Sequence, residues 1–214
     1  MTIYEPLRGK TLMTYLNHLI SQNTTFFQIC SVLSDLIVFA FPLILIFLTI
    51  TWWKQKKTIL QEIALIIFSS SVIAALINII IQLFITKDRP ESLPWLELIL
   101  KHLPTMSFPS DHAAVAMAFS VSFLLLLSKQ SRNYKIIWSI ILIGSIIMGV
   151  CRTAVAVHRP TDILVWWTIG ALSAYFIYTI KESMYVKKMI TVIVWLENKI
   201  LDVLFNRFRQ QDTK

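Results

Sequence analysis

The chain has 214 residues, of which 56% are hydrophobic and only 15% are charged, and its net charge is +8. This composition is more apolar than that of a soluble domain, and the length suits one compact unit. The positive charge does not indicate a nucleic-acid partner, because the basic residues lie in short loops and in the tail, as in membrane proteins. Cys30 and Cys151 form no metal-binding pattern; they could form one disulfide, but two free thiols are the simpler interpretation. We therefore expect a single membrane domain over residues 1–214.

Five uncharged runs predict membrane-spanning helices, because the charges gather between them. A helix needs roughly 20 apolar residues to cross the bilayer core, with about 17 as a lower limit. The third and fourth runs are slightly short, so their ends must include polar neighbours that find partners inside a bundle. The sequence thus predicts an all-α integral membrane bundle of five to six transmembrane helices, with the runs at 36–53, 63–86, 113–128, 136–151 and 163–180.

The basic residues predict the orientation of this bundle. With five spans, the loops 54–62 and 129–135 lie on the same side as the tail, and together they hold most of the lysines and arginines. The positive-inside rule makes that side cytoplasmic. The loops 87–112 and 152–162 and the N-terminus then lie outside. We expect a multi-pass protein of the cell membrane with its polar loops on the extracytoplasmic side.

Two flanking segments are predicted to lie at the membrane surface. Residues 1–26 are expected to form an interfacial segment, since 11–19 is short and mixed and the N-terminus lacks the apolar core of a cleavable signal peptide. The tail at 185–214 is expected to be an amphipathic cytoplasmic helix, because residues 189–208 gather their apolar side chains near one helical face. The alternative is a sixth crossing, which would carry several charges through the bilayer core.

The two outer loops hold an unusual set of polar residues. They come from the ends of spans two to five, which the topology brings to one face of the membrane. Each piece alone is common at a span end, but ionisable residues that gather on one face of a membrane bundle indicate a functional site. The set comprises Gln82, Lys87, Arg89, Ser107, Ser110, Asp111, His112, Arg152, His158 and Asp162.

Several of these residues suit the binding of a phosphate group. Arg89 and Arg152 can make bidentate hydrogen bonds to phosphate oxygens. Pro109 favours the first turn of a helix, which would put Ser110 and Asp111 at the N-terminus of the third span. Free backbone N–H groups at such a terminus favour an anion.

Two histidines and one aspartate suit phosphoryl transfer. His158 and Asp162 are four residues apart, so on one helix they would share a face. A carboxylate that holds one imidazole nitrogen leaves the other nitrogen free to attack. His112 is a second imidazole that can protonate a leaving oxygen near neutral pH.

With these residues the sequence resembles the type-2 phosphatidic acid phosphatase (PAP2) superfamily. The family signature has three parts, K-x6-R-P, P-S-G-H and S-R-x5-H-x3-D, and the third part is the specific one. Order and internal spacing agree with this chain, and the resemblance covers about residues 60–180. The corresponding motifs are Gln82-x6-Arg89-Pro90, Pro109-Ser110-Asp111-His112 and Cys151-Arg152-x5-His158-x3-Asp162.

Three positions depart from the signature. Gln82 stands where the family has a lysine, so one phosphate-binding cation is missing, although Lys87 lies nearby and could replace it. Asp111 replaces a glycine and adds an acid beside the expected phosphate. Cys151 replaces a serine and removes a hydroxyl donor. Because the catalytic positions of the family remain, the resemblance implies an active enzyme.

The resemblance also implies a role for each retained residue. His158 attacks the terminal phosphorus and forms a phosphohistidine, and Asp162 orients this imidazole. His112 protonates the leaving lipid phosphate and then activates water. No metal or other cofactor is expected, because arginines supply the positive charge. The equatorial oxygens, where the charge of the transition state gathers, are held by Arg89, Arg152 and Ser110.

Within the superfamily, the Ser-Phe-Pro-Ser-Asp-His sequence at 107–112 is similar to bacterial undecaprenyl-diphosphate phosphatases of the bacitracin-resistance type. The opening is similar too, at 16–20 and at 33–35, before a first span that ends in Trp52-Trp53. This similarity implies hydrolysis of a C55 isoprenyl diphosphate to the monophosphate and phosphate. The reaction would recycle a peptidoglycan precursor on the outer leaflet.

Other functions stay open from the sequence. A phosphatidate, phosphatidylglycerol phosphate or lipid A phosphatase of the same superfamily would carry the same motifs, as would a lipid phosphotransferase. A transporter or channel could use Asn78, Gln82 and Asp35, which lie in or next to the predicted spans. The three departures could also indicate a catalytically inactive structural member.

Asp35 is a further candidate, because it directly precedes the first uncharged run and should lie near the outer interface. An acid buried there needs a cation. We therefore expect Asp35 to support an active-site arginine or lysine. The alternative is a solvated carboxylate at a helix start.

Overall fold

The computed structural model describes residues 7–85, 111–127 and 131–211, and these ranges form seven helices without a strand. The all-α prediction is thereby confirmed for the described part of the chain. The helices are α1 (Leu7–Ser21), α2 (Thr24–Lys54), α3 (Thr58–Phe84), α4 (Asp111–Leu126), α5 (Arg132–Ala154), α6 (Pro160–Ile180) and α7 (Met184–Gln211).

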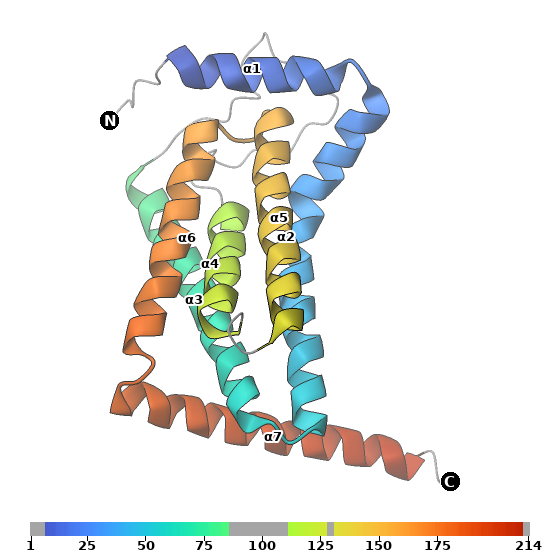
Figure 1. The fold of residues 1–214 in the computed structure, drawn as a ribbon, viewed down its shortest axis with the longest axis vertical. Helices are drawn as coiled ribbons and strands as arrows, with labels where there is room; N and C mark the ends of the chain where they lie inside the picture. The colour runs from blue at the N-terminus through green and yellow to red at the C-terminus, as the bar shows by residue number, and fades with distance from the viewer. Residues whose placement is uncertain (1–6, 86–110, 128–130, 212–214) are drawn as a thin grey trace.

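Five helices form a bundle, and two lie across its ends (Figure 1). α2, α3, α5 and α6 are long and apolar enough to cross a membrane, whereas α4 is a shorter apolar helix. α4 lies among the other four, and no side chain between His112 and Leu126 is exposed. The five uncharged runs of the sequence therefore correspond to α2–α6, and four of these helices have the length and hydropathy of a span.

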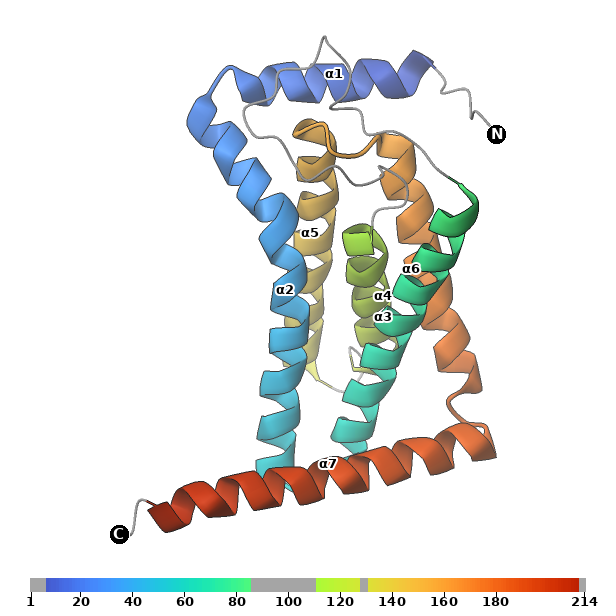
Figure 2. The same ribbon diagram turned by 180° about the vertical axis from the view of Figure 1, so that it is seen from behind.

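α1 and α7 lie at opposite ends of this bundle, which we call the α1 end and the α7 end (Figures 1 and 2). α4 and α6 begin at the α1 end, where α3 and α5 finish, so the predicted convergence of these helix ends is confirmed. The basic segments 54–57, 132–135 and 181–188 lie at the α7 end. α7 lies across the end of the bundle (Figure 2). It is not among the described helices whose length and hydropathy suit a membrane span. This arrangement supports an interfacial helix over a sixth crossing.

α2 begins twelve residues before the uncharged run that predicted it. Asn23 caps the helix, since its Oδ1 accepts a hydrogen bond from N of Phe26 at 3.1 Å. With 31 residues the helix is about 46 Å long, which exceeds the bilayer core of about 30 Å. Asp35 therefore lies inside a helix, which contradicts the alternative of a carboxylate at a helix start. A charged residue that pairs with another residue of the bundle can lie in the middle of a helix. It interrupts the uncharged run of the sequence without interrupting the helix.

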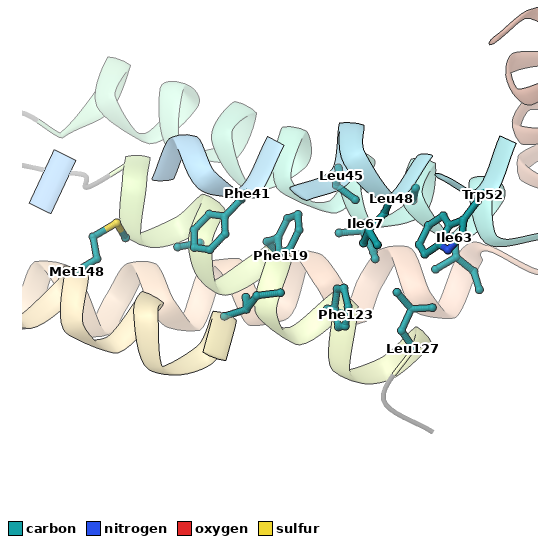
Figure 3. Packing of buried hydrophobic residues seen from close by; sticks show 13 residues of the cluster. Phe41, Leu45, Leu48, Trp52, Ile63, Ile67, Phe119, Phe123, Leu127 and Met148 are labelled. Carbon is teal, nitrogen blue, oxygen red and sulfur yellow. The ribbon is translucent and has the colours of Figure 1, made fainter. Parts of the chain in front are cut away.

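Large side chains from four helices fill the centre of the bundle (Figure 3). The rings of Phe41 in α2 and Phe119 in α4 stack with their centroids 5.1 Å apart. Ile67 of α3 and Met148 of α5 complete the same cluster, and both are fully buried. In a membrane such packing, rather than transfer from water, holds helices together.

Small residues bring α4 and α6 unusually close to each other. A Cβ atom on Gly170 of α6 would lie 2.3 Å from the carbonyl oxygen of Ala114 and 2.9 Å from N of Ala118. The facing side of α4 is rich in alanine, and Ala113, Ala114 and Ala118 are fully buried. Close approach through small residues is a common basis of helix packing in membranes. Here it fixes the helix that carries His112 against the helix that follows His158.

Candidate active site

The third motif, from Cys151 to Asp162, forms a tight turn between α5 and α6. Arg152 is in the last turn of α5, and its carbonyl oxygen accepts hydrogen bonds from N of Val157 at 3.1 Å and from N of His158 at 3.2 Å. Ala156 adopts a left-handed conformation, with φ of 61°. The chain thus folds back on itself, so that His158 returns to the side of Arg152.

Arg152 and His158 form a buried pair at the α1 end. Nη2 of Arg152 lies 3.1 Å from Nε2 of His158, and the two residues are 5% and 2% exposed. A guanidinium can only donate, so a hydrogen bond here requires an unprotonated Nε2 and places the ring proton on Nδ1. That tautomer presents a lone pair on Nε2, beside a cation that can hold phosphate oxygens.

Asp35 binds the same arginine from α2. Nη1 of Arg152 donates to Oδ1 of Asp35 at 3.0 Å and to the carbonyl oxygen of Ser34 at 2.8 Å. The prediction that Asp35 pairs with a cation of the site is therefore confirmed. A buried cation needs such partners, because burial without them is costly. Asp35 and Ser34 hold one edge of the guanidinium, and His158 lies on the other nitrogen.

Asp162 lies in the first turn of α6 and is almost fully buried. Its Oδ2 accepts a hydrogen bond from N of Arg159 at 3.1 Å, which caps the helix. His158 precedes α6, so the prediction that both residues share a helical face is wrong. The physical reason is Pro160, which occupies the first helical position and disfavours helical conformation at the residue before it. The role of Asp162 in orienting His158 stays a prediction.

The remaining predicted residues lie partly inside the described ranges. His112 is the second residue of α4 and is half-buried at the α1 end, and Gln82 is half-buried in the last turn of α3. Asp111 is the first residue of α4, as expected for a helix start, and its side chain is outside the described part. The structure thus brings the helix ends with Gln82, His112 and Arg152 to one end of the bundle. Lys87, Arg89 and Ser110 lie outside the described residues.

α1 also contributes to this site, a contribution that the motifs of the sequence did not predict. Nδ2 of Asn17 donates to the carbonyl oxygen of Ala154 at 3.0 Å, and Met13 packs against Ala156. Met13, Asn17 and Ile20 are at most 3% exposed and recur at helical spacing. This periodic side of the segment was the signal that could have revealed a packed helix. α1 therefore supports the turn that leads to His158.

The two cysteines are free thiols, and both are buried. They belong to one cluster with Phe27 and Val155, between α2 and the end of α5. The simpler interpretation of the sequence is therefore confirmed. Cys151, which stands where the family signature has a serine, packs beside Arg152 into apolar surroundings.

The charged residues at the α7 end form ion pairs between near neighbours in the sequence. Hydrogen bonds from Lys181 and Lys187 lower the pKa of Glu182 from 4.5 to about 2. Within the described ranges no group of three His, Cys, Asp or Glu side chains could hold a metal ion. The α1 end instead combines a buried guanidinium with an imidazole lone pair, an arrangement that can bind an anion and attack it.

Comparisons with known proteins identify the family of this chain and two solved structures with a similar fold. The profile of the PAP2 superfamily matches residues 63–184. The chain is 24% identical over 190 residues to the protein named undecaprenyl-diphosphatase BcrC of Bacillus subtilis (strain 168), and the match covers 86% of this chain and 90% of that protein.

Two crystal structures share the fold at low sequence identity. One is a PAP2 type phosphatidylglycerolphosphate phosphatase from Bacillus subtilis, with a TM-score of 0.63 and 19% identity over 84% of this chain and 89% of that chain. The other is Aquifex aeolicus LpxE, with a TM-score of 0.60 and 22% identity over 84% and 99% of the two chains.

Proposed function

Because the chain belongs to the PAP2 superfamily, we propose that it hydrolyses undecaprenyl diphosphate and that His158 is its nucleophile. At the level of the family it is a membrane lipid phosphatase. The observation that carries the proposal is the buried pair of Arg152 and His158, whose facing nitrogens lie 3.1 Å apart. The named relative, similar over nearly its whole length, supports the choice of substrate.

The proposed reaction has two steps. In the first, the lone pair on Nε2 of His158 attacks the terminal phosphorus, and the bond from this phosphorus to the bridging oxygen breaks. His112 gives a proton to that oxygen, and undecaprenyl phosphate leaves. In the second step water attacks the phosphorus of the phosphohistidine while His112 takes a proton from that water, the bond from phosphorus to Nε2 of His158 breaks, and phosphate is released.

Positive groups would stabilise the negative charge that develops on the phosphoryl oxygens. Arg152 already lies next to Nε2 of His158, and Asp35 and the carbonyl oxygen of Ser34 hold its other nitrogen. When the substrate binds, Nη2 would shift its hydrogen bond from Nε2 of His158 to a phosphoryl oxygen, which frees the Nε2 lone pair for the attack, while Asp35 and Ser34 keep the guanidinium in place. We assign Arg89 and Ser110 to the same phosphoryl group, with Lys87 as a further cation beside it. The site would face the extracytoplasmic side, where the diphosphate appears.

Phosphate release by the purified protein tests the proposal. The panel contains undecaprenyl diphosphate, phosphatidate, phosphatidylglycerol phosphate and lipid A, with a His158→Ala variant as the matched control. We expect the highest kcat/KM for undecaprenyl diphosphate and no release by the variant. A preference for one of the other lipids would assign the chain to that activity of the superfamily, and release by the variant would refute the nucleophile.

A further inference from the structure

A groove of about 420 Å³ opens between α2 and α3 next to α7, at the opposite end from the candidate active site. Along α2 it extends from Pro42 to Ile50, which corresponds to about 12 Å of helix. Ile46 and Phe68 border it and are exposed on the outside of the bundle. α7 passes across the nearby ends of α2 and α3 (Figure 2), and three of its residues line the groove. The groove therefore runs along α2 and α3, from α7 toward the middle of the bundle.

One polar group in the groove is buried without a donor. Gln61 of α3 is 1% exposed, and its Nε2 donates to Oδ1 of Asn198 at 2.8 Å. Its Oε1 lies among the buried atoms that accept no hydrogen bond within the described part of the protein. Buried oxygens of this kind normally have a donor, so a ligand with an N–H or O–H group would satisfy it.

A second polar group in the groove is an acid without a cation. Ile193, Glu197 and Leu201 are spaced four apart on α7 and all line the groove. Glu197 is half-buried in this otherwise apolar row, and burial raises its pKa above 4.5. No lysine or arginine of the described chain pairs with it, and Nζ of the nearby Lys199 lies 3.9 Å from the Trp195 ring centroid instead. A cationic donor would complement this carboxylate.

We propose that the groove binds a phospholipid with a primary ammonium headgroup from the leaflet at the α7 end. The ammonium group donates to Oε1 of Gln61 and to the carboxylate of Glu197, and one acyl chain follows the apolar wall of α2 and α3. A primary ammonium supplies both the N–H donors and the charge. A quaternary ammonium has the charge without a donor, and a glycerol headgroup has donors without the charge.

Native mass spectrometry of the delipidated full-length chain tests this site. Synthetic phosphatidylethanolamine, phosphatidylcholine and phosphatidylglycerol with identical acyl chains are titrated separately. We expect phosphatidylethanolamine to bind about tenfold more tightly than either of the others, as for a charge-assisted hydrogen bond. Equal affinities, or tighter binding of phosphatidylglycerol, would overturn the proposal.

Two variants that preserve side-chain size connect the preference to the groove. Glu197→Gln should lower the affinity for phosphatidylethanolamine about tenfold, to the level of phosphatidylcholine. Gln61→Met removes the acceptor and should lower it severalfold. The matched control is Glu182→Gln, which removes an exposed acid at the same end outside the groove and should leave the preference unchanged. A preference that survives in Glu197→Gln would refute the site, whatever the phosphatase activity.

Discussion

The two ends of the bundle handle charge in opposite ways. At the α1 end the side chain of Arg152 is 6% exposed, and it pairs with Asp35, which lies 117 residues away in the sequence. At the α7 end Lys187 and Glu182 are 60% and 62% exposed, and they are neighbours at the junction of α6 and α7. An ion pair that joins distant segments and has one buried member fixes a geometry, whereas exposed local pairs contribute little energy and are screened by salt. Chemistry is therefore expected at the first end, and orientation in the membrane at the second.

The strongest test of this contrast is the removal of the two histidines at the α1 end. His158→Ala should abolish turnover of every substrate, because no covalent step remains. His112→Ala should lower turnover of the lipid substrate by about 100- to 10,000-fold, since the leaving oxygen lacks its proton donor. With an aryl phosphate that leaves readily, the His112 variant should recover part of its rate.

A trapping experiment checks the same assignment directly. Brief exposure to labelled substrate followed by an alkaline quench should leave acid-labile phosphate on the wild-type protein and none on His158→Ala. Label that persists without His158 would mean that another residue is the nucleophile.

The second test is the orientation of the bundle in the membrane. Its readout is whether each of two loops is labelled from outside the cell or not. Single cysteines at Ser92 and Gln130, in a background without Cys30 and Cys151, should differ in labelling by an impermeant thiol reagent. We expect labelling at position 92 from outside the cell and none at 130, because the positive-inside rule predicts that the basic loops are cytoplasmic. Labelling at 130 alone would invert the orientation.

Gly170 tests how the site helices are held together. Gly170→Ala should destabilise the protein by about 1–3 kcal/mol, because the added Cβ would overlap the Ala114 backbone of α4. Thermal unfolding in detergent measures the effect. Gly144→Ala is the control, since its Cβ would lie 3.8 Å from Cγ2 of Ile37, an ordinary contact distance. Equal stability of the two variants would contradict close packing of α4 on α6.

Asp35 tests whether its ion pair with Arg152 positions the guanidinium. Asp35→Asn should lower kcat/KM about tenfold, because the guanidinium loses a charged partner that is itself partly exposed. Asp35→Glu should restore part of the rate, whereas a purely structural residue would show no such dependence on charge. Asp202→Asn at the α7 end, where Asp202 accepts from Nε1 of Trp53, should leave the rate unchanged. Full activity of Asp35→Asn would leave the carboxylate without a role in the site.

The smallest effect is expected from the exposed acid at the α7 end. The folded pKa of Glu182 is lowered from 4.5 to about 2, so its pairing with Lys181 and Lys187 stabilises the fold above pH 4.5 and is lost as the pH falls toward 2. The difference in unfolding temperature between wild type and Glu182→Gln should be small and should vanish over this window. A difference that grows at low pH would have the wrong sign.

The sequence predicted most of the bundle, because uncharged runs of sufficient length must be satisfied by helices in a membrane. It predicted the start of α2 wrongly, since Asp35 is a charge with a partner inside the bundle rather than a helix boundary. It also treated His158 as helical, although Pro160 and Asp162 together form a typical helix start after it.

The sequence predicted which residues form the candidate site better than it predicted the contacts between them. The pairing of Asp35 with a cation could be expected from the cost of burying an acid, but the choice of Arg152 depends on how α2 packs against α5. The hydrogen bond from Asn17 to Ala154 joins residues 137 positions apart and has no local signature. Long-range geometry of this kind follows from tertiary packing, which the spacing of motifs does not specify.

The left-handed conformation of Ala156 has a consequence for the N-terminal helix. An alanine in this region of backbone space costs on the order of 1–3 kcal/mol, a cost that glycine would avoid. The alanine methyl group is fully buried against Met13, so α1 compensates for an unfavourable backbone. Glycine at 156 would remove the backbone strain at the positive φ angle. It would also increase the conformational entropy of the unfolded chain and remove the methyl group that packs against Met13. The turn that places the imidazole of His158 thus gains rigidity from α1, whose Asn17 lies 137 positions before Ala154 in the sequence.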